Sequence, residues 1–292
     1  PMRAVLMGRD GLPHGRADLH AAGIPAYIFP ESAARALNAL NRQSEWAARP
    51  MAAFVPRDVD RASAAAVIDT AVRERRDQLT LLEALALLRA YGIPCAAAAC
   101  AKNASELVAA GAAVGYPLAM KLSSPDITHK TDVGGIRLGL QTSDALLTAY
   151  DAMMEQVRHK VPNAHIECVL LQRMVEGGRE TIAGLARDPS FGALLMFGLG
   201  GVFFEALEDV VFRVAPVDEV QARDMLHGIR GNKVLRGIRG APPADESALA
   251  DALCRLGQLA GDFPQIAELD VNPLLVFERG VIGVDARVRL TL

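Results

Sequence analysis

The segment that most constrains the fold lies near the C-terminus, where two apolar runs flank the tripeptide ERG at 278–280. The runs are AELDVNPLLVF (267–277) and VIGVDARV (281–288), and the short polar break with its glycine is typical of a hairpin turn. Side chains two residues apart in a strand point to the same face. The first run therefore predicts a strand with one apolar face, formed by Leu269 and its alternate neighbours, and one polar face.

The polar face of this hairpin carries oxygen ligands. Glu268, Asp270 and Asn272 alternate along the first strand, and the hairpin brings Asp285 beside them. Carboxylates held this close repel each other unless a cation lies between them. Oxygen ligands suit Mg²⁺, which keeps several waters and is commonly completed by substrate phosphates. The pattern favours a magnesium site over the alternative, an ordinary polar sheet face.

A second candidate is the lysine in YPLAMKL (116–122), which predicts a strand with Lys121 as its one charged residue. Burying an ammonium group is costly unless it meets an anion. Two anions can meet that need. One is a nucleotide phosphate, which makes Lys121 functional, and the other is a structural carboxylate.

The segment SSPDITHKTDVGG (123–135) connects this strand to the next one, IRLGL (136–140). Glycines and small hydroxylated residues let backbone N–H groups approach phosphate oxygens, and Lys130 adds positive charge. The connection is long for an ordinary hairpin, which favours a functional loop. Its His129 is open to three interpretations: a solvated loop residue, an acid–base group, or a phosphoryl acceptor.

Glycines also follow the apolar run LLMF, in GLGG at 198–201. This resembles half of a dinucleotide-binding fingerprint, but GxGxxG does not occur, so support for a Rossmann cofactor is weak. The sequence contains no GxxxxGK[ST], which excludes a P-loop, and no GxSxG.

The first 48 residues have their own pattern. A strand over 3–8, a helix over 15–22, a strand over 24–29 and a helix over 30–46 give the order β-α-β-α, which predicts parallel pairing of the strands. Two strands are too few for a complete sheet domain. We therefore expect residues 1–48 to be the C-terminal fragment of an α/β domain.

Residues 49–78 are predicted as a linker with helical content, because two prolines precede an amphipathic stretch over 58–74. From there the pattern changes. Thr80 and Glu83 have the spacing of a helix-capping box, and helices and strands then mix along the chain. The expected fold class is α/β at the front and α+β over 79–292.

Composition and charge exclude several kinds of protein. Hydrophobic residues make up 51% of the chain and charged residues 22%, which allows a packed core. The formal charge of −3 gives no general attraction to nucleic acid or acidic membranes. We find neither a membrane-spanning run nor a signal peptide, and expect a cytoplasmic protein. No CxxC occurs, so buried reduced thiols are expected at Cys95, Cys100, Cys168 and Cys254.

Four segments resemble one known family when they are taken together. They are GYPLAMKLSSPDITHKTDVGGI, VLLQRMVEGGRE, RDPSFGALLMFGLGG and ELDVNPLLV, and they resemble the ATP-grasp part of NDP-forming acyl-CoA synthetases of the ADP-forming acetyl-CoA synthetase type, relatives of the succinyl-CoA synthetase β subunit. The resemblance covers about residues 79–292, and HKTDVGG is its most specific part. Residues 1–48 resemble the end of the family's second CoA-ligase-like domain, which is flavodoxin-like.

The resemblance implies an ATP-grasp fold of two α+β subdomains that binds ATP or ADP with Mg²⁺. It implies that Lys121 contacts the nucleotide phosphates and that Glu180 lies near the ribose. Gly200 and Gly201 fall in a matched segment and are expected in the nucleotide site. The adenine is expected to pair with the backbone of a hinge formed by Gln172, Arg173, Met174 and Val175.

The resemblance also implies metal ligands and a phosphoryl carrier. Asn272 and Asp285 fall on the family's Mg²⁺ ligands, and Asp270 replaces the family's glutamate. His129 matches a histidine that is regarded as a second phosphoryl carrier. The implied reaction interconverts acyl-CoA, ADP and phosphate with carboxylic acid, CoA and ATP through phosphohistidine.

The family's primary phosphorylated histidine and CoA-binding domain precede the matched region, so the chain is expected to be incomplete for full turnover. Its expected partners are the nucleotide and the remaining CoA-binding domains, in cis or in trans, with CoA and the acyl substrate bound through them. An oligomer is expected for the full enzyme, with no nucleic acid or membrane partner. Two alternatives are an ATP-grasp module of a regulatory protein acetyltransferase and an ATP-grasp carboxylate–amine ligase.

Overall fold

The computed structural model describes residues 2–6, 12–48, 54–124, 126–127, 131–201, 209–237, 240 and 242–292, and every structural statement below concerns these residues. Tertiary contacts divide the chain into two compact units, Pro1–Ala53 and Phe54–Leu292. Each unit is described by itself. No described helix is long and apolar enough to cross a membrane.

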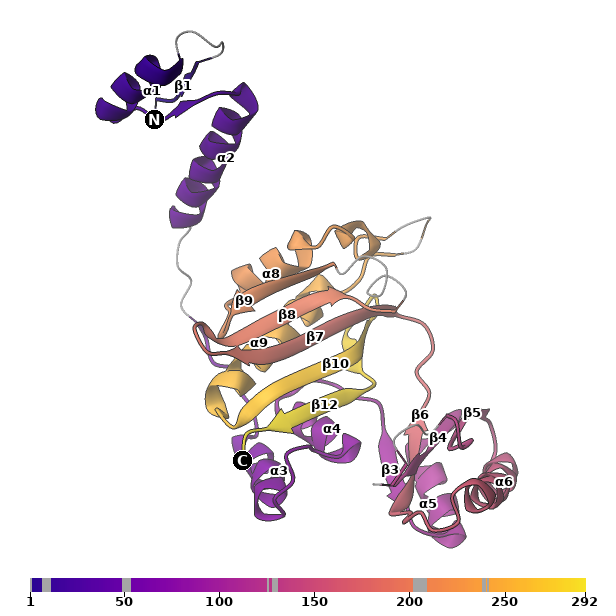
Figure 1. The fold of residues 1–292 in the computed structure, drawn as a ribbon. Coiled ribbons are helices and arrows are strands. Elements are labelled where there is room, and N and C mark those ends of the chain that lie inside the picture. The colour runs from indigo at the N-terminus through magenta and orange to yellow at the C-terminus, as the bar shows by residue number, and fades with distance from the viewer. Residues whose placement is uncertain are drawn as a thin grey trace. The chain divides into compact units, whose positions relative to one another are not determined.

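The first unit has the predicted β-α-β-α order (Figure 1). Its strands β1 (Ala4–Val5) and β2 (Ala26–Tyr27) pair in parallel, as their alternation with helices predicts. Along the chain, helix α1 (Leu12–Ala21) comes between β1 and β2, and helix α2 (Pro30–Ala47) follows β2. Pro30 opens α2, where its fixed φ fits the first turn of a helix.

The larger lobe of the second unit is built on a six-stranded antiparallel sheet (Figure 1). Five of its strands lie in the order β11-β10-β7-β8-β9, and β12 pairs with β10. The bounds of these strands are β7 Arg179–Asp188, β8 Gly192–Leu199, β9 Val210–Val214, β10 Ile266–Val276, β11 Val281–Gly283 and β12 Ala286–Leu290. The predicted closing hairpin is β10–β11, which turns at residues 277–280.

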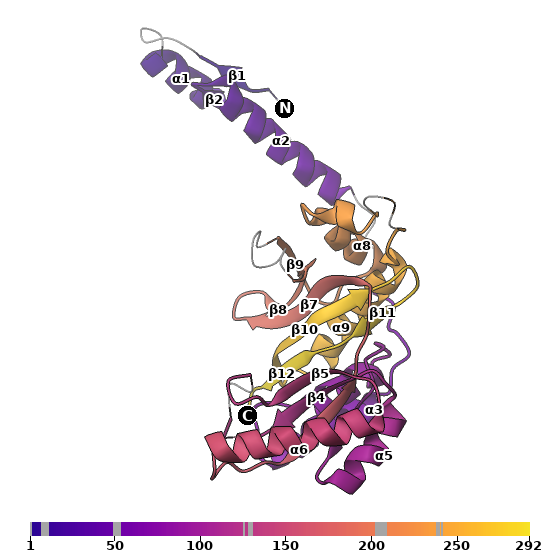
Figure 2. The same cartoon turned by 90° about the vertical axis from the view of Figure 1, so that its right-hand side faces the viewer.

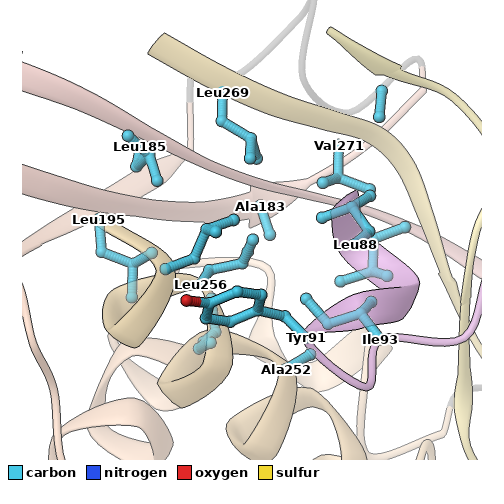
Figure 3. Close-up of a cluster of buried hydrophobic side chains, with 14 of the residues drawn as sticks. Leu88, Tyr91, Ile93, Ala183, Leu185, Leu195, Ala252, Leu256, Leu269 and Val271 are labelled. Atoms are coloured by element: carbon cyan, nitrogen blue, oxygen red, sulfur yellow. The ribbon is translucent and has the colours of Figure 1, made fainter. Parts of the chain in front are cut away.

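Helices cover one face of this sheet and share its core. They are α3 (Arg61–Arg73), α4 (Leu81–Ala90), α8 (Glu219–Gly228) and α9 (Glu246–Asp262), with a 3₁₀ turn η1 at Asn232–Val234. In Figure 3, Leu88, Tyr91 and Ile93 meet Leu185, Leu195, Leu256 and Leu269 from the sheet and α9. Ala64, Ile68 and Ala71 of α3 belong to the same core. Residues 54–78, which the sequence predicts as a linker, therefore pack as part of this unit.

The smaller lobe has a four-stranded antiparallel sheet in the order β3-β6-β4-β5 (Figure 1), and Figure 2 shows β4 and β5 of this sheet from another side. Its strands are β3 (Ala98–Ala101), β4 (Leu118–Ser123), β5 (Ile136–Leu140) and β6 (Cys168–Arg173). Helices α5 (Ala104–Val114) and α6 (Ser143–Lys160) pack on one face. Met120 and Leu122 of β4 point into that core, so the alternating residue Lys121 points to the opposite face.

Backbone contacts tie the two lobes together. The segment after β6 runs directly into β7, and two hydrogen bonds join the stretch before β3 to β11. In these, Ala96 N donates to Gly283 O at 2.9 Å and Gly283 N donates to Pro94 O at 2.8 Å. The open face of each sheet is thereby held close to the other lobe.

The predicted capping box at the start of α4 is confirmed. Thr80 Oγ1 accepts a hydrogen bond from Glu83 N at 3.3 Å, and Glu83 Oε2 accepts one from Thr80 N at 2.7 Å. The two side chains satisfy backbone donors that the first turn of a helix leaves free.

Replacing Thr80 by alanine removes this cap and is expected to lower the free energy of unfolding by about 1 kcal/mol. Denaturant unfolding followed by circular dichroism measures the loss. Thr148→Ala is the matched control, because Thr148 lies inside α6 and only bonds back to Asp144 O. It should change stability little, since alanine is the better residue in a helix interior. Equal losses in both variants would contradict the capping role.

Candidate functional site

A cavity of about 950 Å³ is lined by residues of both lobes. The smaller lobe contributes the open face of β4 and β6, and the larger lobe contributes the open face of β7, β8, β10 and β12. The charged side chains in its lining are Lys121, Glu167, Glu268, Asp270, Asp285, Arg287 and Arg289. The strand lysine and the acidic hairpin, which are about 150 residues apart in sequence, thus face one space.

A buried glutamine holds Lys121 in place. Lys121 Nζ donates a hydrogen bond of 3.0 Å to Gln172 Oε1. Gln172 is 2% exposed, and its Nε2 donates to Val284 O at 2.6 Å. Val284 precedes Asp285, so one amide connects the lysine of the smaller lobe to the acidic hairpin of the larger lobe. The partner of Lys121 in the structure is therefore an amide rather than the structural carboxylate of the alternative interpretation.

On the opposite wall, β10 and the residues around β12 form three cross-strand pairs. Arg289 lies opposite Glu268, and Arg287 lies opposite Asp270. At the third position, Asn272 N donates to Asp285 O at 3.1 Å. The predicted oxygen ligands Asp270, Asn272 and Asp285 all line the cavity.

Asp270 is half-buried between a glycine and an arginine. On the β7 side its cross-strand partner is Gly184, which lacks a side chain, and on the β12 side it is Arg287. A Cβ added to Gly184 would lie 2.8 Å from Leu269 O, so the strands approach too closely for a larger residue. Burial raises the pKa of Asp270, Arg287 opposes this shift, and the charge of Asp285 adds to it.

The donor set fits Mg²⁺. Asp270 and Asp285 offer carboxylate oxygens and Asn272 an amide oxygen, and Mg²⁺ commonly takes one or two carboxylates, with waters and substrate phosphates completing an octahedron. Glu268 is set apart from them, because Arg289 Nη2 donates to its Oε1 at 2.6 Å. No group of three or more His, Cys, Asp or Glu able to hold a metal exists among the described residues. Asp270, Asn272 and Asp285 suit a cation whose coordination is completed by waters and substrate oxygens.

The expected hinge, Gln172 to Val175, lies where β6 leaves the smaller sheet. Arg173 N donates to Ala97 O at 2.8 Å, and Met174 N donates to Pro117 O at 2.9 Å. Val175 N donates no backbone hydrogen bond to any described residue. Its N–H is thus open to a ligand, as backbone recognition of a base requires.

Glu180, Gly200 and Gly201 form a group of their own, which is absent from the cavity lining. Gly200 N donates to Glu180 O at 2.8 Å. Gly201 has a φ of +61°, and a Cβ there would lie 2.4 Å from Glu180 Oε2. The glycines therefore give the Glu180 carboxylate room beside the end of β8.

Two of the sequence-based expectations have other outcomes. His129 lies outside the described residues, together with Thr128 and Lys130. Its role stays a prediction.

The expectation of four buried reduced thiols is wrong for Cys100 and Cys168. They form a disulfide with Cα atoms 5.9 Å apart, because β3 and β6 are neighbours and both residues point to the cavity face. Cys100 is exposed and Cys168 half-buried. Cys95 and Cys254 are free, as expected, and burial raises the pKa of each thiol to about 11.

Sequence reasoning missed two residues of the site. The predicted hinge uses only the backbone of Gln172 and assigns no role to its side chain. The sequence-based site also lacks Arg287, although this residue follows Asp285 at the spacing that keeps two residues on one face of a strand. That alternation was the available signal.

Two α+β lobes line one cavity with the open faces of their sheets. Lys121 lies on one wall of this cavity and the carboxylates lie on the other, and this arrangement is that of an ATP-grasp fold. A family model described as an ATP-grasp domain matches residues 70–290, and the chain belongs to this family. Within it, the chain belongs with the ATP-grasp portion of the NDP-forming acyl-CoA synthetases.

Two relatives and one solved structure show this grouping. The chain is 39% identical over 288 residues to ADP-forming acetate–CoA ligase I of Archaeoglobus fulgidus, across 97% of this chain and 41% of the relative. It is 41% identical to the β subunit of ADP-forming acetate–CoA ligase I of Pyrococcus furiosus, across 78% of this chain and 98% of that subunit.

The solved structure is acetyl-coenzyme A synthetase 1 of Ca. Korarchaeum cryptofilum in complex with coenzyme A and Mg-AMPPCP, with its phosphohistidine segment pointing towards the nucleotide binding site. It matches at 36% identity with a TM-score of 0.70, across 78% of this chain and 100% of that one. The chain spans about two fifths of the length of the single-chain relatives that it matches first.

Replacing Gln172 by leucine is expected to lower the free energy of unfolding by about 1–3 kcal/mol, because Val284 O and the Lys121 ammonium lose their buried partner. Gln258→Leu is the matched control. Gln258 also makes two hydrogen bonds, to Arg57 N and Arg57 O, but it is half-buried and water can replace them. Denaturant unfolding compares the two variants. A loss of unfolding free energy in Gln258→Leu as large as that in Gln172→Leu would contradict the greater contribution of the buried hydrogen bonds of Gln172.

Proposed function

We propose that this chain is the nucleotide-binding part of an NDP-forming acyl-CoA synthetase, in which it binds ATP or ADP with Mg²⁺ for phosphoryl transfer. One observation carries the proposal. Lys121 and the oxygen ligands Asp270, Asn272 and Asp285 face each other across one cavity, although they come from different lobes.

The charges of the cavity support a metal–nucleotide complex rather than a bare anion. Its lining has four carboxylates and three cations, and one of those cations is already paired with Glu268. A polyphosphate alone would meet net repulsion there. Bound Mg²⁺ would neutralise the carboxylates and the phosphates together, which is its usual contribution to phosphoryl transfer.

The chain's own residues suggest how the nucleotide lies. The open N–H of Val175 suits the adenine, and Glu180, which has room beside Gly200 and Gly201, suits the ribose hydroxyls. Lys121 is held by Gln172 with its ammonium at the cavity, where it suits the phosphates. Each of these roles agrees with the family resemblance.

The chemistry proposed for the whole enzyme joins acyl transfer to nucleotide phosphorylation. Acyl-CoA and phosphate give an acyl phosphate and CoA. A histidine takes the phosphoryl group from the acyl phosphate, which releases the carboxylic acid, and ADP then receives the phosphoryl group to form ATP and free the histidine. His129 is proposed as a phosphoryl carrier of this chain, on the resemblance of HKTDVGG alone. The relatives are named as CoA ligases, which supports this function over an acetyltransferase module or a carboxylate–amine ligase.

CoA and the acyl substrate are proposed to bind through further domains, in cis or in trans. Both arrangements occur among the relatives, since one is a single long chain and another is a separate β subunit. Residues 1–48 are proposed to be the end of such a CoA-ligase-like domain.

Asp285→Asn tests the metal site. It keeps the shape of the side chain but removes one charge from the donor set, so the gain in ADP affinity that Mg²⁺ produces should fall at least about tenfold. Calorimetric titration of ADP with and without Mg²⁺ measures this gain. Glu268→Gln is the control, because it removes the same charge from a carboxylate that Arg289 already occupies. An unchanged Mg²⁺ dependence in Asp285→Asn would refute the assignment.

The phosphoryl-carrier role is tested with γ-labelled ATP and Mg²⁺. The 292-residue chain should acquire label that is lost in acid and stable in base, as a phosphoramidate is. His129→Ala should abolish the label. His165→Ala, which changes an exposed histidine of the smaller lobe, should retain it. Label that persists in His129→Ala would eliminate this residue as the carrier.

A further inference from the structure

The strand pairs on the larger-lobe wall differ in how well their charges are satisfied. Arg289 and Glu268 form an ion pair at 2.6 Å, with the guanidinium donating from both Nε and Nη2. Arg287 lies two residues away on the same strand and the same face, opposite Asp270. Its side chain forms no hydrogen bond and no ion pair with any described residue. It interacts electrostatically with Asp270.

An arginine without a partner is commonly just a solvated surface residue. Arg287 is exposed as well, but it lines the cavity and lies opposite the half-buried carboxylate of Asp270. The pairs Arg287–Asp270 and Arg289–Glu268 have the same cross-strand register, but among the described residues only the second forms an ion pair. The guanidinium of Arg287 instead keeps all five of its N–H donors available.

The strand register also gives Arg287 a position along the nucleotide. Residue 179, just after the hinge, pairs with Val276, whereas Ala186 pairs with Glu268. Moving along β10 away from the hinge, one therefore passes Asn272 first, then Asp270, then Glu268. Arg287 lies beside Asp270, so it is one pair beyond Asn272 and Asp285, a step of about 7 Å along the strand.

A nucleotide whose base is bound at the hinge reaches this wall with its phosphates. The phosphate furthest from the base lies past the level of Asn272 and Asp285. The next cation in that direction is Arg287, because Arg289 beyond it is already paired with Glu268. Lys121 supplies the cation of the opposite wall, but it is a point charge already tied to Gln172. A planar guanidinium can hold two oxygens of one phosphoryl group at once, which an ammonium cannot.

We propose that Arg287 binds the terminal phosphoryl group of the nucleotide from the larger-lobe wall, opposite Lys121, and so selects the triphosphate and holds the group that is transferred. This inference rests on the proposed function, because it assigns a new contact within the same nucleotide site. It makes Arg287 a substrate-binding residue.

Calorimetric titration of the full chain with AMPPCP, ADP and AMP in excess Mg²⁺ tests this inference. Arg287→Gln should weaken AMPPCP binding by roughly tenfold to a hundredfold, as loss of a charged hydrogen-bond pair does. The affinity for AMP should change less than about twofold, because AMP does not reach this level of the wall. Arg287→Lys keeps the charge but not the planar fork, so its AMPPCP affinity should lie between those of wild type and Arg287→Gln.

Arg289→Gln is the matched control, since it removes the same unit charge from the same face of the same strand. It should leave the ratio of AMPPCP to AMP affinity within about twofold of wild type. Thermal unfolding of all three variants establishes that they are folded, and Arg287→Lys serves if Arg287→Gln is not.

Three results would overturn the inference. An equal loss of affinity for AMPPCP and for AMP in Arg287→Gln would show a general effect on the site. A loss of AMPPCP affinity in Arg289→Gln as large as that in Arg287→Gln would show a nonspecific effect of charge. Failure of the wild-type chain to bind any of the three nucleotides would refute the proposed function itself, and this inference with it.

Discussion

The buried amide of Gln172 is the contact on which the geometry of the site depends. Its oxygen is occupied by Lys121 and its nitrogen by Val284 O, so neither end is left to water. An amide that is 2% exposed must have such partners, because an unsatisfied polar group at this depth costs about 1–3 kcal/mol. The same requirement fixes where the lysine ends and how close the acidic hairpin comes to it.

In the sheet of the larger lobe, strand alternation places core side chains on one face and the side chains of the site on the other. Along β10, Leu269 and Val271 point to the helices and enter the core, so Asp270 points to the cavity. β7 and β12 flank this strand, and each contributes one neighbour to Asp270. Because the β7 neighbour is Gly184, the carboxylate is open on that side, and because the β12 neighbour is Arg287, it has a cation on the other.

Much of this arrangement can be predicted from the sequence where the cause is local. The capping box at Thr80 and the polar face of the closing hairpin follow from spacing within a few residues, and the parallel pairing of Ala4 with Ala26 follows from the β-α-β order of one short stretch. Each of these patterns is satisfied by neighbours along the chain, so the sequence contains the whole reason for it.

Contacts between distant segments could not be predicted in this way. Gln172 meets Lys121 across 51 residues and Val284 across 112, and no local pattern marks those partners. The pairing of Cys100 with Cys168 depends on which strands are neighbours in the smaller sheet. The packing of α3 likewise depends on a core completed by α4 and the distant α9. Residue type predicted an anion as the partner of Lys121, whereas the fold places the amide of Gln172 beside it.

The charges of the cavity are balanced only when a metal ion and a nucleotide bind together. Asp270 and Asp285 crowd negative charge into a half-buried space, and burial already raises the pKa of Asp270. Arg287 beside them has no counter-ion of its own among the described residues. A cation alone would satisfy the carboxylates and leave the arginine unpaired, whereas a phosphate alone would satisfy the arginine and repel the carboxylates. A metal–polyphosphate complex satisfies both, and each component therefore strengthens the binding of the other by the same factor.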